Sequence, residues 1–286
     1  MLRVVQASFL VSFVHLTTAL GLLLTWGRSF AAAQTNAETL AEGITGPGWA
    51  AAAKSSLAFS SGNVDLLEVR GEASTHFATH HPDADQDSAR FWFRDRVLVY
   101  GSAGFKRVAG DRVANDGYAH VRYTRMQWRR LGAEVFGQAQ YDQFRLLSRR
   151  LLVGSGVRVV FAALDRFGGW LGSGYLAEFE KRDIEPENRP PQGPDRVHML
   201  NHRFSNYVTI RAATTEDKLA FVNTLYVQPR WDAFSDLQLL DEARLQIKLA
   251  PRLSLTVDAS VLLDTRPPVG VKRRDIRVGN GLVVRL

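Results

Sequence analysis

The feature that most constrains the fold is a strict alternation of apolar and polar side chains. In the stretch RLSLTVDASVLLD, residues 252–264, every odd-numbered position from Leu253 to Leu263 is apolar. Ser254, Thr256 and Asp258 stand between them. Successive side chains of a β-strand point to opposite faces, so this pattern indicates a strand with one apolar face and one polar face. The apolar face covers a core in a soluble sheet and contacts lipid in a membrane barrel.

The same alternation recurs about twelve times along the chain, and helical periodicity is rare between these segments. Most segments have about ten or more residues, whereas globular strands average about 5–6 residues and tilted membrane strands need about 9–11. The sequence therefore predicts an all-β fold, an antiparallel up-and-down transmembrane β-barrel of about 12 strands within residues 49–286. The expected strands lie near residues 50–60, 64–79, 89–102, 117–128, 131–143, 148–163, 169–181, 198–213, 217–229, 236–249, 252–264 and 275–286.

The connections between these segments alternate in length. Tight connections are expected at residues 129–130, 164–168, 214–216 and 250–251, and long loops at 103–116, 182–197, 229–235 and 265–274. Short turns at one end and long loops at the other are typical of outer-membrane barrels. This layout places the long loops outside the cell and both termini in the periplasm, with the medium connection 80–88 as an exception.

The N-terminal segment has the pattern of a cleavable signal peptide. Arg3 precedes a long apolar region, and the small residues of RSFAAAQ offer cleavage after Ala33. Residues 1–33 are therefore interpreted as the signal peptide and residues 34–48 as an irregular periplasmic lead-in. A single membrane anchor is the alternative, although Arg28 cuts the apolar run short of a full span.

Composition excludes several classes of chemistry. The sequence contains no cysteine, which removes disulfides, thiolate catalysis and cysteine metal sites. Its net charge of +7 comes from arginines interleaved with acidic residues, without any nucleic-acid-reading motif. We therefore expect no nucleic acid as a partner.

Four motifs together resemble a known family: SGN at 61–63, EVFGQAQYDQF at 134–144, RRLLVGSGVR at 149–158, and LDTRPP from Leu263 with Lys272 and Asp275 behind it. They are similar to the salt-induced outer-membrane protein family, also called domain of unknown function 481. The resemblance implies an outer-membrane barrel of uncharacterised activity, with a structural or permeability role and a link to salt or osmotic stress. It supplies no catalytic residue and no cofactor. The partners expected for such a barrel are outer-membrane lipid, lipopolysaccharide and the barrel-assembly machinery.

Two polar clusters were weighed as chemical sites. The first is HFATHHPDADQD, which carries His76, His80, His81, Asp83, Asp85 and Asp87. Histidine and aspartate can bind a divalent metal, but Ser88 and Arg94 stand where a calcium loop has its glycine and its glutamate. The pattern therefore favours a solvated turn over a metal site. In NHRFSN, strand alternation places Ser205 opposite His202 and Asn206, so a nucleophile and its base cannot meet locally. We expect no enzymatic activity, with an outer-membrane lipid hydrolase as the remaining alternative.

The inward-facing charged positions form the third candidate site. These side chains either fill a narrow lumen with ion pairs or line a channel for small solutes with a weak preference for anions. The channel would be favoured by open space beside the inward glycines Gly154, Gly156, Gly172 and Gly174. If the lumen is wet, Asp258→Asn should cost much less stability than Val257→Arg on the lipid face. The lumen-facing candidates are Arg70, Arg94, Arg96, Arg122, Glu134, Asp142, Arg158, Glu178, Arg203, Arg211, Glu242, Arg244 and Asp258.

Aromatic residues near the expected strand ends suggest girdles at the two membrane interfaces. The residues assigned to these girdles are Trp92, Phe93, Trp128, Trp170, Tyr175, Phe179, Tyr226 and Trp231.

Overall fold

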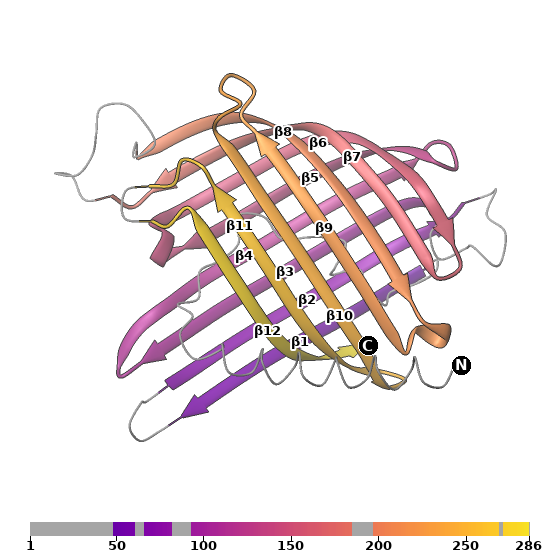
Figure 1. Cartoon of the computed structure of the whole chain (residues 1–286), viewed down its shortest axis with the longest axis horizontal. Coiled ribbons are helices and arrows are strands. Elements are labelled where there is room, and N and C mark those ends of the chain that lie inside the picture. The colour runs from indigo at the N-terminus through magenta and orange to yellow at the C-terminus, as the bar shows by residue number, and fades with distance from the viewer. Residues whose placement is uncertain (1–47, 61–65, 82–92, 185–196, 269–270, 286) are drawn as a thin grey trace, which may run out of the picture.

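Twelve antiparallel strands close into one barrel in the computed structural model (Figure 1). The structure describes residues 48–60, 66–81, 93–184, 197–268 and 271–285, so the expected signal peptide and nearly all of the lead-in lie outside it. The strands are β1 (Gly48–Ser60), β2 (Leu66–His80), β3 (Phe93–Val108), β4 (Asp111–Met126), β5 (Leu131–Asp142), β6 (Leu147–Leu164), β7 (Phe167–Arg182), β8 (His198–Ala213), β9 (Leu219–Pro229), β10 (Leu237–Ala250), β11 (Leu253–Asp264) and β12 (Arg274–Arg285). Two short 3-10 helices, η2 (Gln143–Arg145) and η4 (Thr215–Asp217), occupy connections. No helix among the described residues is long and apolar enough to cross a membrane.

Each strand pairs with its neighbour in sequence, and β12 pairs back with β1. The closing register places Ala52 opposite Arg285 and Ser55 opposite Leu282. The closing register contains four residue pairs, and along these pairs closure replaces a free sheet edge, which hydrocarbon cannot solvate, by strand pairing. The prediction of an all-β antiparallel barrel of about twelve strands is confirmed.

The two ends of the barrel differ in their connections. Gly48 and Arg285 lie at one end, called here the terminal end, where the described turns are short. The opposite end, the loop end, carries the connections 183–197, 230–236 and 265–273. The expected long loop at residues 103–116 is wrong, because β3 and β4 continue until only Ala109 and Gly110 separate them.

The outer face of the barrel is apolar and exposed, the reverse of a water-soluble protein. In β5 the odd-numbered side chains from Leu131 to Tyr141 are mainly exposed, while Glu134, Gln138 and Asp142 on the even positions are buried. Val153 on β6 is 60% exposed. Exposed apolar side chains all around a closed sheet fit hydrocarbon as the surrounding solvent.

Part of the interior is filled by apolar and aromatic side chains. This buried group consists of Met126, Val160, Trp170, Tyr207, Tyr226, Leu240 and Leu262, with Phe93 packed against it. Trp170 and Tyr226 therefore do not belong to an interfacial girdle, because their side chains point inward and are 7% and 1% exposed. Trp128, Tyr175, Phe179 and Trp231 are exposed, and Trp92 lies outside the described residues.

The inward glycines, which would favour a channel if they opened the lumen, are instead packed against neighbouring groups. A ring fills the space beside two of them, Phe136 at Gly154 and Tyr207 at Gly172. At the Gly156–Gly174 pair, the backbones of β6 and β7 approach so closely that a Cβ on either residue would clash. At these positions the missing side chain of glycine is replaced by a neighbouring ring or backbone, so the glycines do not widen the lumen.

Candidate functional site

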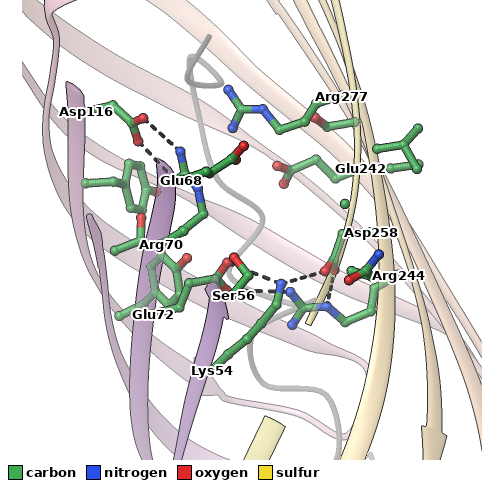
Figure 2. A pocket seen from close by; sticks show the side chains of 18 of the residues that line it. Lys54, Ser56, Glu68, Arg70, Glu72, Asp116, Glu242, Arg244, Asp258 and Arg277 are labelled. Carbon is green, nitrogen blue, oxygen red and sulfur yellow. Dashed lines mark hydrogen bonds and ion pairs between the residues drawn. The ribbon is translucent and has the colours of Figure 1, made fainter. Parts of the chain in front are cut away.

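A cavity of about 330 Å³ lies inside the barrel between β1–β4 and β10–β12. Its walls carry charged and hydroxyl side chains from both groups of strands (Figure 2). The charged lining residues are Lys54, Glu68, Arg70, Glu72, Asp116, Glu242, Arg244, Asp258 and Arg277. The cavity therefore has room for a small molecule or several waters, and its surface is polar.

Four of these residues form an ion-pair group, called here the charged cluster: Lys54, Glu72, Arg244 and Asp258. Lys54 Nζ lies 2.6 Å from Asp258 Oδ2 and 3.2 Å from Glu72 Oε1. Arg244 Nε donates to Asp258 Oδ1, and its Nη2 lies 3.8 Å from Glu72 Oε2. Each cation thus contacts both carboxylates, and the cluster connects β1, β2, β10 and β11 (Figure 2).

The position of Lys54 depends on a glycine of β12. A Cβ at Gly281 would clash with the Lys54 side chain. With no side chain at this inward position, Lys54 passes in front of β12 and reaches Asp258 on β11.

The charged cluster separates the cavity from a second, smaller space of about 20 Å³. Lys54, Glu72 and Arg244 line both spaces. The cavity lies on the side of Ser56 and Arg70, whereas the small space lies on the side of Ala52, Ser74 and Gln246. Along β1, β2 and β10 the cluster residue stands between the residues of the two spaces, so the cluster forms a partition across this half of the interior.

A second ion pair lies farther into the cavity. Arg70 donates two hydrogen bonds to Asp116, at 3.0 and 2.8 Å, in the bidentate geometry that a guanidinium and a carboxylate favour. Gly104 makes room for this pair, since a Cβ there would clash with both side chains. At the same wall, Lys106 Nζ lies 2.9 Å from Glu68 Oε2.

The other half of the interior is closed by contacts between distant strands. Glu134 on β5 accepts hydrogen bonds from Arg158 at 3.2 Å and from the Tyr207 hydroxyl of β8 at 2.6 Å. Arg122 Nη2 on β4 donates to the Tyr226 hydroxyl of β9 at 3.4 Å. These bonds span the lumen, because β4 and β9 are not neighbours in the sheet.

Glu178 is the centre of a further network toward the loop end. It accepts hydrogen bonds from Arg150 at 2.7 Å and Arg203 at 3.1 Å. Arg150 also donates to Gln238 of β10 at 2.7 Å, and Arg203 Nη2 donates to Asp236 at 2.9 Å. All five side chains are buried, so these ion pairs fill this part of the interior.

The same network continues into the connection between β9 and β10. Arg230 donates to both Asp232 and Asp236 there. The hydrogen bond from Arg230 lowers the pKa of the Asp232 carboxyl to about 2, so this carboxylate stays charged through the ordinary pH range.

One known sequence family matches most of the chain. The sequence profile described as "Protein of unknown function, DUF481" matches residues 72–286. The chain belongs to the DUF481 family. No curated protein matches the chain.

Several solved barrels resemble the DUF481 protein at low sequence identity. The NanC porin has a TM-score of 0.46 at 9% identity, covering 82% of this chain and 98% of its own. The KdgM porin in complex with disordered oligogalacturonate has a TM-score of 0.41 at 9% identity, with 82% and 98% covered. The outer-membrane protein Omp33 of Acinetobacter baumannii has a TM-score of 0.32 at 9% identity, with 86% and 100% covered.

The other lumen-facing candidates of the DUF481 protein lie near the barrel ends. Asp142 accepts hydrogen bonds from the backbone N–H groups of η2, and Arg211 donates to Asp217 at 3.1 Å. The Arg96 guanidinium lies over the Phe93 ring, 4.5 Å from its centroid. Arg94 was expected inside, but its side chain is 51% exposed and lies 4.0 Å from Asp95.

The lumen-facing residues predicted from the sequence do not include several members of these networks, among them Asp116, Lys54 and Arg150. Asp116 fell within a predicted loop, and Lys54 and Arg150 were not recognised as inward-facing. A signal existed for Lys54, because a lysine within a membrane strand is expected to face the interior and find a carboxylate there.

The two chemical clusters weighed from the sequence form no site among the described residues. Ser205 is buried and accepts a hydrogen bond from Gln228 at 3.3 Å, whereas His202 contacts the Tyr175 hydroxyl on the outer face. His76 and His81 are buried, and Asp83, Asp85 and Asp87 lie outside the described residues. No group of three or more metal-ligating side chains occurs in the described part of the chain.

Proposed function

We propose that this DUF481 protein is an outer-membrane barrel with a permeability role, and that the charged cluster closes its lumen. The observation that carries the proposal is the position of the charged cluster between the polar cavity and the smaller space. On the far side, hydrogen bonds between non-neighbouring strands fill the interior. Passage of a small polar solute would therefore run along β12, β1 and β2 and would require the cluster to open.

The chemistry of the cluster supports such a closure. Its four side chains are only 10–26% exposed, so their mutual attraction is screened less than that of surface pairs. Breaking the pairs exposes no backbone, because the ladders between β1, β2 and β12 do not involve these side chains. The partition can therefore open by side-chain rearrangement while the barrel stays intact.

The lining gives no support to a preference for anions. Four cationic side chains, Lys54, Arg70, Arg244 and Arg277, face five carboxylates, Glu68, Glu72, Asp116, Glu242 and Asp258. We therefore propose passage of small polar solutes with little charge selection.

The outer membrane is the proposed location, with the loop end outside the cell and the termini in the periplasm. The apolar outer face supports contact with lipid, and the proposed partners are outer-membrane lipid, lipopolysaccharide and the assembly machinery. A link to salt or osmotic stress rests on the family resemblance alone. This proposed link predicts that a strain lacking the protein grows more slowly than the wild-type strain at raised sodium chloride.

Conductance in planar bilayers tests the closure. We expect the wild type to be nearly silent and the double variant Lys54→Ser/Asp258→Ser, which leaves the net charge unchanged, to show reproducible conductance steps. The matched control is Arg211→Ser/Asp217→Ser, which removes a neutral pair near the terminal end and should stay silent. A folded Lys54→Ser/Asp258→Ser barrel that is as silent as the wild type would refute the role of the cluster.

A further inference from the structure

One cation of the cavity, Arg277, forms no ion pair with a carboxylate of the described residues. Nε and Nη2 of Arg277 are buried, and no group among the described residues accepts a hydrogen bond from either atom. Arg277 extends from β12 into the cavity (Figure 2). Guanidinium N–H groups that are buried without an acceptor cost free energy, so an acceptor group brought by a ligand would stabilise this arrangement.

The carboxylates that line the cavity have other partners. Asp116 accepts both of its hydrogen bonds from Arg70, and Glu68 pairs with Lys106. Asp258 and Glu72 belong to the charged cluster, and Glu242 also has an interaction of its own. Arg70 and Asp116 act most strongly on Arg277, followed by Asp275 and Asp142. Among the described residues, none of these three carboxylates accepts a hydrogen bond from Nε or Nη2 of Arg277.

Free space adjoins the unpaired guanidinium. Gly279 follows Arg277 on the same inward face of β12, and nothing lies within 4 Å of the position that a Cβ would take there. Ser102, Ser260, Tyr118 and Gln140 add hydrogen-bonding groups to the lining. A volume of about 330 Å³ is at the lower end of the range for small-molecule sites.

We propose that the cavity binds a small carboxylate, with its carboxylate group on Arg277 beside Arg70 and its other polar groups on the hydroxyl and amide lining. The planar fork of an arginine matches a carboxylate better than any neutral solute. This inference goes beyond the permeability role, because a solute can be held on the loop-end side of the charged cluster whether or not the cluster opens.

Calorimetric titration of the detergent-solubilised full barrel tests the site. The probe is D-gluconate, and glucitol is its matched control, since it replaces the carboxylate with a hydroxymethyl group. We expect gluconate to bind and glucitol to bind at least about tenfold more weakly, because only gluconate supplies the charge-assisted pair.

Three variants locate the binding. Arg277→Gln should weaken gluconate binding by about tenfold or more, whereas Arg285→Gln, on the same face of β12 near the terminal end, should stay within about twofold of the wild type. Gly279→Leu fills the free space without changing charge and should also abolish binding. Retained heat-modifiable migration in gels shows that each variant is folded.

Each contrary result overturns the proposal. Equal affinity for gluconate and glucitol, unchanged gluconate affinity in Arg277→Gln, or no heat of binding with about 10 mM gluconate excludes a carboxylate site at Arg277. The conductance of the charged-cluster variant is measured separately, so failure of this site leaves the proposed closure standing, and the reverse also holds.

Discussion

At the scale of the residue, Asp258 shows what the alternation of apolar and polar side chains predicts and what it does not. Its position in β11 predicts an inward side chain, and a wet lumen would make Asp258→Asn mild. In the structure Asp258 accepts hydrogen bonds from both Lys54 and Arg244. We therefore expect Asp258→Asn to lower the free energy of unfolding by about 3 kcal/mol, because it leaves two largely buried cations with a single carboxylate.

Denaturant unfolding in detergent micelles, followed by tryptophan fluorescence, measures this effect. Val257→Arg, on the lipid face beside it, should cost about 2–4 kcal/mol, so the two variants should be similar. Ser260→Ala, on the inward face next to Asp258, is the control and should stay within about 0.5 kcal/mol of the wild type. An Asp258→Asn barrel as stable as this control would mean that the charged cluster contributes nothing to stability.

At the scale of the element, the hairpin of β3 and β4 shows where the alternation of side chains fails to predict a strand. Residues 103–116 predict a loop because glycines and charged residues interrupt their apolar alternation. A strand that continues beyond the hydrocarbon needs no apolar outer face, so alternation reports only its lipid-embedded part. The turn itself has positive φ at both Ala109 (51°) and Gly110 (87°), the geometry of a tight two-residue hairpin.

The hairpin gives a prediction of its own. Asparagine tolerates the left-handed region better than alanine, so Ala109→Asn should raise the free energy of unfolding by about 1 kcal/mol. Gly110→Ala is the opposite control and should lower it by about 1 kcal/mol or more. The same denaturant titration measures both, and destabilisation by Ala109→Asn would argue against a two-residue turn at this position.

At the scale of the whole molecule, the sequence predicts the barrel but not the contents of its lumen. Alternation says which side of the sheet a residue faces, and it is repeated in every strand. Lys54 and Asp258 are 204 positions apart, and Arg150 and Gln238 are 88 apart. Which inward residues meet depends on the stagger and closure of the whole sheet. For this reason the sequence alone does not predict which side chains Asp116 and Lys54 pair with.

The inverted distribution of polarity leads to the last prediction. A barrel with exposed apolar side chains and buried ion pairs should remain with the membrane in high salt and alkaline carbonate and be released by detergent. Because the chain has no cysteine, single cysteines report its orientation. Asp232→Cys at the loop end should react with a membrane-impermeant maleimide on intact cells, whereas Glu216→Cys at the terminal end should react only after lysis. Release by carbonate would refute membrane insertion, and the opposite labelling pattern would reverse the proposed orientation while leaving the barrel unchanged.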